Sequence, residues 1–265
     1  MNHKHTVKTT PTSKFRLDGR RAMVTGGSKG IGEALARGLA EAGADLILVA
    51  RGQDALDSAQ TRLGNTGRQI ETAPFNLVDT DAIADFYGRV TDQYGPIDIL
   101  VNNAGTTRRG AIDKLTLDDW RTVIELNLTS MFALSQVFAR ERISADQPGK
   151  IINIGSLMSS TARANNVPYA SSKGGVLLMT KALAVDLAPH NILVNAIGPG
   201  FIDTPMNKPL VEDPQFSQWV EERCPLGRWG TPEDIAGTVV FLASSASDFL
   251  TGQMIYVDGG WLARF

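Results

Sequence analysis

Short apolar runs alternate with segments of helical periodicity along most of this chain. The runs occupy residues 22–25, 46–50, 71–75, 97–102, 150–154, 192–197 and 254–257. After the first run, Ile31, Leu35 and Leu39 recur at the spacing of one face of an α-helix, and Gly43 is a residue type at which such a helix ends. The pattern therefore predicts strands that alternate with helices.

Further helices are expected near residues 53–63, 79–94 and 169–188, after Thr231-Pro232, and over a long segment that begins at Thr116. Thr116 and Asp119 have the spacing of a capping box. Continuous apolar strands between helices indicate a parallel sheet that is covered on both faces. The expected fold class is α/β, a single-domain Rossmann-type doubly wound parallel sheet with helices on both faces and ligands at the carboxyl ends of the strands.

The chain of 265 residues divides into a short tail and one domain. Residues 1–13 are polar and aperiodic, which predicts a flexible N-terminal tail. His3 and His5 could bind a metal there, although two histidines on a loose tail usually have no such function. Because no linker or repeat follows Phe15, residues 14–265 are expected to form a single Rossmann-fold catalytic domain.

Composition and charge exclude several classes of protein. The chain has 26 Lys and Arg residues against 28 Asp and Glu residues, a formal net charge of −2. A binder of nucleic acid or of a membrane surface would need a basic face, and no apolar run reaches the roughly 20 residues of a membrane helix. A lone cysteine, Cys224, excludes an internal disulfide and a multi-cysteine metal site. These features predict a cytoplasmic protein that binds neither nucleic acid nor membrane.

A glycine-rich turn lies between the first strand and the first helix. It has the sequence Thr25-Gly-Gly-Ser-Lys-Gly-Ile-Gly32. Glycines let the backbone approach a pyrophosphate, and the helix N-terminus offers free N–H groups and a positive dipole end. The strand–turn–helix context therefore predicts a dinucleotide site, with contacts from Gly26, Ser28, Lys29, Gly30, Ile31 and Gly32.

The end of the second strand distinguishes the two nicotinamide cofactors. An acidic residue at that point would bind the free ribose 2′-hydroxyl of NAD. Here Ala50 is followed by Arg51, and Lys29 adds a second cation nearby. Cations without a carboxylate favour the 2′-phosphate of NADP, so NADP is the predicted cofactor. The alternative is that both cations are solvated surface charges.

Three side chains indicate acid–base chemistry. Tyr169 and Lys173 are four positions apart, so they share one face of a helix. A free phenol titrates near 10, and a neighbouring ammonium is expected to lower that pKa toward the working range. Ser156 follows the buried strand at 150–154, at the end where this fold binds its ligands, and its hydroxyl can hold a substrate oxygen.

These residues resemble the short-chain dehydrogenase/reductase family, from about Lys14 to the C-terminus. The resemblance rests on the order and spacing of the glycine-rich turn, Asn102-Asn-Ala-Gly105, Asn127, Ser156, Tyr169-Ala-Ser-Ser-Lys173 and Pro199-Gly200. It implies that Tyr169 is the general acid/base, that Ser156 polarises the carbonyl, and that Lys173 lowers the tyrosine pKa and binds the nicotinamide ribose. Asn127 would hold a water that links Lys173 to solvent.

The resemblance also implies the remaining cofactor contacts. Asn103, Ala104 and Gly105 would line the adenine ribose, and Asn76 and Leu77 occupy the adenine position. Many relatives have Asp where Asn76 stands, so an amide oxygen would make the adenine contact here. The nicotinamide, including its carboxamide side, would be contacted by Pro199, Gly200, Ile202 and Thr204.

The substrate is less well defined by the sequence. Relatives place a substrate-covering lid at about residues 201–223. The expected substrate contacts are Ser156, Met158, Arg163 and Tyr169. Further candidates are Arg108, Arg109, Asn165 and Asn166. Cations and amides near the acceptor carbon suit a carboxylate-bearing substrate, and the alternative is that the arginines are surface residues or subunit contacts.

Several segments resemble the gluconate 5-dehydrogenase and 2-deoxy-gluconate 3-dehydrogenase branch of the family. They are Asn102–Arg109, Arg228-Trp-Gly230, Val240–Asp248 and Val257–Ala263. The expected function is NADP(H)-dependent interconversion of a sugar-acid secondary alcohol, such as gluconate, and its keto form. A 3-oxoacyl-thioester (acyl-carrier-protein) reductase or a general ketone reductase is the alternative within the class.

Two other classes fit the sequence poorly. A non-catalytic NADP-binding regulator would have lost one of Ser156, Tyr169 and Lys173. A metal-dependent dehydrogenase would need Cys and His ligands, whereas His190 is the only histidine outside the tail, so no metal is expected. Relatives are mostly homotetramers, which is the expected assembly.

Overall fold

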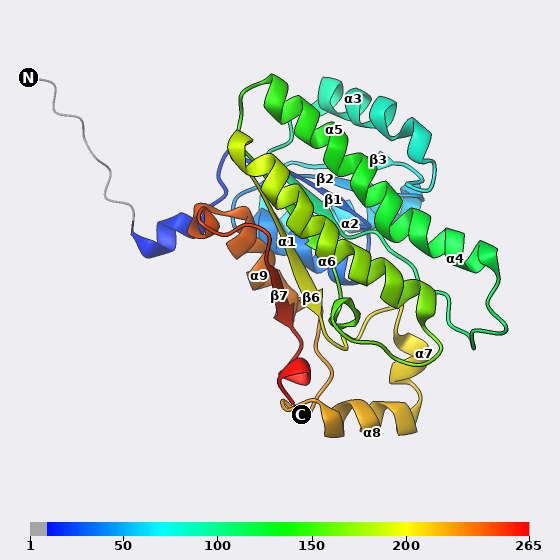
Figure 1. The fold of residues 1–265 in the computed structure, drawn as a ribbon. Helices are drawn as coiled ribbons and strands as arrows, with labels where there is room; N and C mark the ends of the chain where they lie inside the picture. Colours follow the sequence, from blue (N-terminus) through cyan, green and yellow to red (C-terminus); the bar gives the residue numbers. More distant parts are fainter. Residues whose placement is uncertain (1–9, 265) are drawn as a thin grey trace, which may run out of the picture.

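Seven parallel strands form the sheet at the centre of the computed structural model, which describes residues 10–264 (Figure 1). Their order across the sheet is β3-β2-β1-β4-β5-β6-β7, and every neighbouring pair is parallel. The order reverses at β1, next to β4, which is the switch point where a doubly wound sheet binds ligands. The strands are β1 (Arg21–Thr25), β2 (Asp45–Ala50), β3 (Ile70–Pro74), β4 (Ile99–Asn102), β5 (Gly149–Ile154), β6 (Ile192–Pro199) and β7 (Met254–Val257).

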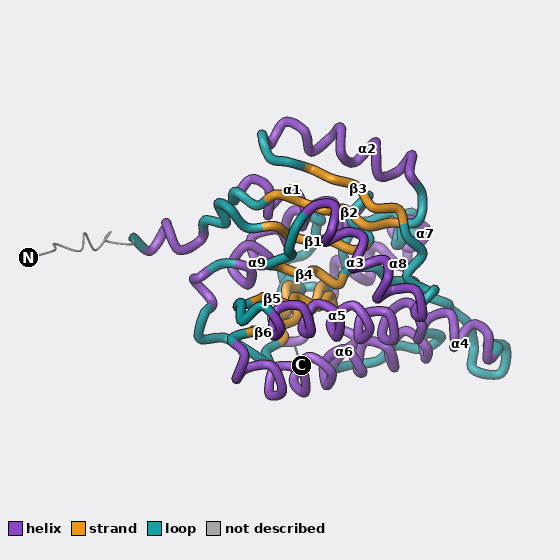
Figure 2. The backbone as a smooth tube through the Cα atoms, turned by 90° about the horizontal axis from the view of Figure 1, so that it is seen from above, coloured by secondary structure: helices purple, strands orange, loops and turns teal. Residues whose placement is uncertain are grey.

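Helices cover both faces of this sheet (Figure 2). On one face lie α1 (Gly30–Glu41), α2 (Gln53–Leu63) and α9 (Glu233–Ala243). On the other lie α3 (Ile83–Tyr94), α5 (Ser130–Ser144) and α6 (Val167–Leu187), with α4 (Leu117–Ile124) beside α6. Two short helices, α7 (Lys208–Val211) and α8 (Pro214–Arg223), lie beyond the carboxyl ends of the strands.

The alternation of side chains along each strand supplies a core on both faces. In β1, Val24 packs with α1 and α9, whereas Met23 packs in the cluster that contains α3 and α5. Both side chains are fully buried. The prediction of an α/β doubly wound sheet with two covered faces is confirmed, and so are the capping box of Thr116 with Asp119 and the end of α1 just before Gly43.

Two expectations differ from the structure in detail. Residues 1–9 of the expected tail lie outside the described residues, and its last residues enter a short 3-10 helix, Pro11–Phe15. The helical run Leu117–Ser144 is long and apolar enough to cross a membrane by length and composition, which the sequence reading overlooked. It packs against α3 and α6 as a core helix of the domain, with 44% of its most apolar window buried.

Candidate active site

A cleft of about 910 Å³ runs along the carboxyl ends of the strands. Its walls come from the glycine-rich turn, the ends of β2, β4, β5 and β6, the first turn of α6, and the segment before α7. It is lined by the predicted cofactor residues Gly26, Ser28, Lys29, Gly30, Ile31, Gly32, Arg51, Asn76, Leu77, Asn103, Ala104, Gly105, Pro199, Gly200, Ile202 and Thr204. The predicted chemical residues Ser156, Met158, Arg163, Tyr169 and Lys173 line the same cleft.

The glycine-rich turn is shaped by close backbone contacts. Gly26 has a φ of +64°, which L side chains rarely adopt. A Cβ on Gly32 would lie 2.1 Å from the carbonyl oxygen of Gly26, so only glycine fits at that position. Asn103 Nδ2 donates hydrogen bonds to the carbonyls of Thr25 (2.9 Å) and Gly26 (3.2 Å). The Asn103 side chain therefore holds the turn in place, a contact that the sequence reading missed.

The charge of the cleft has one sign. Six cationic side chains line it, and among the lining residues within 10–264 there is no Asp or Glu. Arg51 and Lys29 lie at the β2 end, and both are exposed to the cleft. The six are Lys29, Arg51, Arg108, Arg109, Arg163 and Lys173. A cleft whose charged lining residues are all cationic suits a polyanionic ligand.

Ser156 is fixed at the end of β5 by two local hydrogen bonds. Its Oγ accepts from the backbone N–H of Met158 (3.1 Å), and its own backbone N–H donates to Ser159 Oγ (3.2 Å). The residue is buried, with 7% of its surface exposed, and it lines the cleft. The strand end and the turn after it therefore hold this hydroxyl in one position.

Lys173 is buried one turn after Tyr169 on α6. Its Nζ donates a 2.6 Å hydrogen bond to the carbonyl of Ile154 and lies 5.7 Å from the centre of the Tyr169 ring. The ammonium therefore lies over the face of the Tyr169 ring. Burial lowers the pKa of Lys173 to about 8, because a charged amine is costly in a dry site.

The titration of Tyr169 differs from the sequence expectation. Burial raises the pKa of its phenol above the usual value, and the Ser156 hydroxyl and the Arg109 guanidinium both oppose that rise. The expected net lowering of the tyrosine pKa is therefore wrong in direction for this structure, because burial penalises the charged phenolate more than the neighbouring groups stabilise it.

Asn127 lies in a π-helical turn, Glu125–Thr129, that interrupts the run from α4 to α5. Its side chain is fully buried. Nδ2 donates to the carbonyl of Thr106 and to Ser172 Oγ (both 3.0 Å), and Oδ1 accepts from the Thr106 N–H (2.8 Å). Such π-turns often occur at functional sites. Asn127 thus connects the strand end of β4 to α6, the helix that carries Tyr169 and Lys173.

Two arginines stand at the end of the cleft beside Tyr169. Arg163 Nε is buried without a hydrogen-bond partner, and its guanidinium lies 4.9 Å from the centre of the Phe216 ring on α8. Arg109 Nη2 donates to Asn207 Oδ1 (3.2 Å). Arg108, the other candidate, pairs with Asp119 at 3.7 Å. Of the two amide candidates, Asn166 lines the cleft and Asn165 is not among its lining residues.

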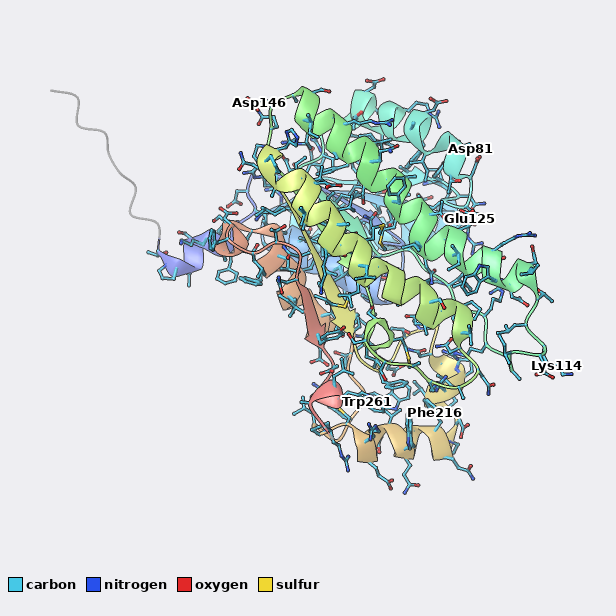
Figure 3. All side chains as sticks on the ribbon, viewed as in Figure 1. Asp81, Lys114, Glu125, Asp146, Phe216 and Trp261 are labelled. Carbon is cyan, nitrogen blue, oxygen red and sulfur yellow. The ribbon has the colours of Figure 1, made fainter. Side chains whose placement is uncertain are left out.

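An aromatic cluster holds the segment after β6, which we term the lid segment (residues 201–223). Phe201 contacts four aromatic rings with centroid distances of 4.6–5.8 Å. These rings are Phe216, Trp219, Trp229 and Trp261. In Figure 3, Phe216 on α8 and Trp261 near the C-terminus lie below the strand ends. This apolar cluster was not among the features expected from the sequence.

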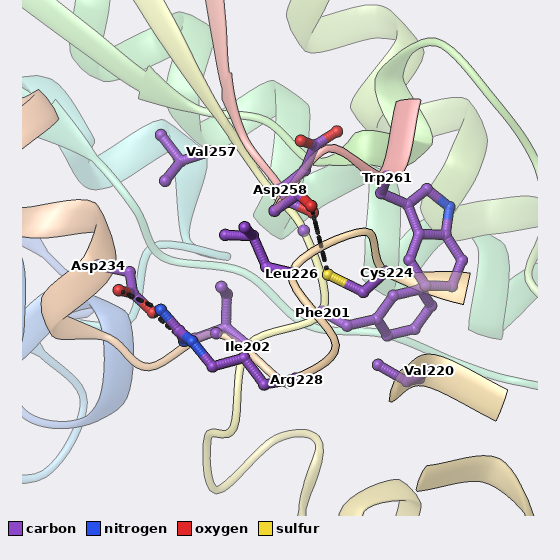
Figure 4. Close-up of a pocket in the computed structure, with 13 residues that line it drawn as sticks. Phe201, Ile202, Val220, Cys224, Leu226, Arg228, Asp234, Val257, Asp258 and Trp261 are labelled. Carbon is purple, nitrogen blue, oxygen red and sulfur yellow. Dashed lines mark hydrogen bonds and ion pairs between the residues drawn. The ribbon is translucent and has the colours of Figure 1, made fainter. Parts of the chain in front are cut away.

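A smaller cavity of about 140 Å³ lies beside the lid segment (Figure 4). It shares Gly200, Phe201 and Ile202 with the wall of the main cleft, and the ion pair of Arg228 with Asp234 (2.7 Å) stands at one side. Cys224 is buried in its wall, with Sγ 3.5 Å from the carbonyl oxygen of Gly259. The free thiol is therefore a packed side chain.

The family follows from comparison with known proteins. The family described as enoyl-(acyl carrier protein) reductase matches residues 26–262. Gluconate 5-dehydrogenase of Gluconobacter oxydans (strain 621H) is 42% identical over 246 residues, which cover 93% of this chain and 96% of that protein. The 5-keto-D-gluconate 5-reductase of Escherichia coli (strain K12) is 41% identical over 248 residues, 94% of this chain and 97% of that protein.

A solved structure gives the same result. The gluconate 5-dehydrogenase of Burkholderia cenocepacia J2315, in complex with NADP and tartrate, is 41% identical, with a TM-score of 0.91 over 95% of this chain and 98% of that chain. This chain belongs to the short-chain dehydrogenase/reductase family. It is an NAD(P)-dependent oxidoreductase that acts on CH–OH groups, and within the family it resembles the gluconate 5-dehydrogenase and 5-keto-D-gluconate reductase branch.

Proposed function

We propose that this enzyme uses NADP(H) to interconvert a secondary alcohol of a sugar acid, such as gluconate, and the corresponding keto acid. The observation that carries this proposal is the distribution of charge in the cleft. Unpaired cations stand at both ends, and no carboxylate lines it within the described residues. One end then accepts the phosphates of the cofactor and the other accepts the carboxylate of the substrate.

The cofactor end fits a ribose 2′-phosphate. Arg51 follows β2 directly, where an acidic residue would favour NAD. Lys29 stands in the glycine-rich turn, and α1 begins at the next residue with its free N–H groups toward the pyrophosphate position. The same NADP cofactor is bound in the Burkholderia structure.

Replacing Arg51 with Ala is expected to weaken NADPH binding by about tenfold, the value of one charge-assisted hydrogen bond. NADH binding should change by less than about twofold, since NADH has no 2′-phosphate. Fluorescence titration of both reduced cofactors measures the two dissociation constants. Arg37→Ala on the outer side of α1 is the control, since Arg37 bonds to Asn65 and the Arg62 carbonyl away from the cleft. Equal losses for both cofactors would show that Arg51 does not contact the phosphate.

The chemical roles follow from the positions of the side chains. The reduced nicotinamide supplies the hydride when it is bound. In reduction, the Tyr169 hydroxyl gives its proton to the developing alkoxide, and the Ser156 hydroxyl, fixed by its turn, holds the substrate oxygen. Lys173, held by the Ile154 carbonyl, would bind the nicotinamide ribose. Asn127 holds the β4 end against α6. It would also hold a water that links Lys173 to solvent and so relays the proton. Oxidation uses the same groups in reverse order.

The substrate end fits a carboxylate. Arg163 has an unpartnered buried Nε, and Arg109 has no ion-pair partner among residues 10–264. Both lie at the end of the cleft that contains Tyr169 and Met158. Two guanidinium groups can bind a carboxylate with several parallel hydrogen bonds. A sugar acid would then be held by its charged end, while a hydroxyl-bearing carbon reaches Tyr169.

Turnover of a defined set of carbonyl compounds tests this function. We expect NADPH oxidation with 5-ketogluconate and little oxidation of NADH under the same conditions. The comparison set contains uncharged ketones and a 3-oxoacyl thioester. Turnover of only the thioester would replace the sugar-acid proposal with a 3-oxoacyl-thioester reductase, and turnover of only simple ketones would replace it with a general ketone reductase.

We also propose that residues 201–223 cover the substrate and that the enzyme is a cytoplasmic homotetramer. The lid segment borders the cleft at Ile202, Thr204 and Asn207. Large apolar side chains are exposed on the outer helices α5 and α6, where Phe132 is 47%, Leu178 67% and Val185 76% exposed. A second copy of the chain would cover such side chains.

A further inference from the structure

Asn207 connects the lid segment to the substrate end of the cleft. It precedes α7, and its backbone carbonyl accepts from the N–H groups of Leu210 and Val211. Its side-chain Nδ2 donates to the carbonyl of Ile202 (3.0 Å), and its Oδ1 accepts from Arg109 Nη2 (3.2 Å). Both ends of the amide are therefore used, one within the lid segment and one across the cleft.

Hydrogen bonds anchor the chain just before and just after Arg109. Thr107 Oγ1 donates to Asn166 Oδ1 (3.2 Å), and the Gly110 N–H donates to the Asn165 carbonyl (3.1 Å). These bonds fix the backbone on the α6 side of the cleft. The long Arg109 side chain is exposed, and Asn207 is its side-chain hydrogen-bond partner in the structure.

The contrast with Arg108 shows why the type of partner matters. Arg108 faces the carboxylate of Asp119 at 3.7 Å, and this exposed ion pair offsets part of its charge. Arg109 is held by a neutral amide, so its orientation is set while its full positive charge stays available. An aspartate differs from an asparagine by one atom, and at position 207 it would form an ion pair with Arg109 while it loses the hydrogen bond to the Ile202 carbonyl, a loss that affects charged and uncharged substrates alike.

We propose that Asn207 is a positioning and specificity residue, which orients Arg109 with a neutral acceptor so that the guanidinium charge remains free for an anionic substrate. This inference rests on the proposed binding of a carboxylate at the substrate end. A charged sugar acid is then preferred over its uncharged analogue because the lid segment supplies an amide here. The Arg109 guanidinium has five N–H donors and Asn207 accepts from one nitrogen, so the lid segment and the substrate carboxylate can share Arg109.

The test compares Asn207→Asp with Gln218→Glu. Gln218 lies on α8 of the same segment, outside the cleft lining, and bonds to Glu222 (2.8 Å). The two variants therefore add the same charge to the same segment by the same one-atom change. For each, kcat and KM are measured with NADPH and two ketones. These are 5-ketogluconate and L-sorbose, in which a hydroxymethyl group replaces the carboxylate.

In Asn207→Asp the ratio of kcat/KM for 5-ketogluconate to that for L-sorbose should fall about tenfold, mainly through KM, as expected for one lost charged contact. In Gln218→Glu the ratio should change by less than about twofold. Asn207→Ala should weaken the preference less than Asn207→Asp, since it loosens Arg109 without neutralising it. Equal losses for both ketones in Asn207→Asp, or equal effects of the two acidic variants, would overturn the inference.

A second measurement does not depend on the substrate. Phenylglyoxal modifies free arginine side chains, and peptide mass spectrometry reports the rate at Arg109. An ion pair in Asn207→Asp should slow that modification at least about threefold relative to Gln218→Glu. If the wild-type enzyme does not turn over 5-ketogluconate, the proposed function fails, and the modification rate still decides the role of Asn207. Equal rates in the two variants would show that Asn207 does not control Arg109.

Discussion

A Tyr169→Phe variant is expected to retain NADPH binding and to lose turnover by at least about a hundredfold, the lower range for general acid–base catalysis. Phenylalanine keeps the ring that packs under Lys173 and removes only the hydroxyl. The fold and the cofactor contacts of α6 should therefore persist, while the proton donor is lost. Steady-state kinetics and cofactor titration separate these two effects.

The pH dependence of the reaction rate tests the same role of Tyr169 in proton transfer. Because burial raises the pKa of Tyr169 above its usual value, the phenol is protonated at neutral pH. Reduction needs that proton, so its rate should be flat near neutrality and fall as the pH passes above the raised pKa. Oxidation needs the phenolate, so its rate should rise with pH over the same range. Binding of NADP(H), which adds charge beside the phenol, shifts this range in the complex.

The control for Tyr169→Phe is Tyr94→Phe. Tyr94 is the last residue of α3, and its hydroxyl is 3.5 Å from the Thr72 carbonyl, away from the cleft lining. That variant should turn over at the wild-type rate. Undiminished turnover in Tyr169→Phe would mean that another group transfers the proton.

A Gly32→Ala variant is expected to weaken NADPH binding about a hundredfold, because the added Cβ would overpack the turn and displace it. The Cβ would lie 2.1 Å from the Gly26 carbonyl oxygen and 2.5 Å from Asn103 Nδ2, so both the turn and its clamp must shift. The thermal midpoint should also fall by several degrees. Cofactor titration and thermal unfolding measure the two losses.

Gly88→Ala is the matched control for this substitution. Gly88 lies within α3, and an added Cβ there meets no atom within 4 Å. Alanine is a better helix former than glycine, so this variant should bind NADPH normally and unfold at the same or a higher temperature. Normal cofactor binding by Gly32→Ala would contradict the assignment of the turn as the pyrophosphate site.

Tyr169→Phe and Asn207→Asp are expected to affect different steps of the reaction. A loss of turnover in Tyr169→Phe should leave the Arg109–Asn207 contact unchanged, because Tyr169 makes no hydrogen bond to Asn207. A loss of specificity in Asn207→Asp should leave the proton transfer intact. The kcat and KM effects of the two sites are therefore separable.

The local sequence was enough to predict the fold class and the side chains that meet in the cleft. Runs such as 46–50 are apolar throughout, which only a strand covered on both faces tolerates. The glycine-rich turn and the four-residue spacing of Tyr169 and Lys173 are local patterns, because their geometry depends on one turn or one helix. For the same reason the capping box of Thr116 and Asp119 could be read directly.

The tertiary structure decided the contacts between segments that are distant in sequence. The fold buries the phenol of Tyr169, which raises its pKa where the sequence predicted a lowering. It brings Asn103 onto the glycine-rich turn, Phe216 onto Arg163 and Asn207 onto Arg109, which is 98 positions away. No local pattern records these pairs, because hydrogen bonds and ring contacts act over a few ångströms in space, and only the packing of the strands, helices and lid segment sets those distances.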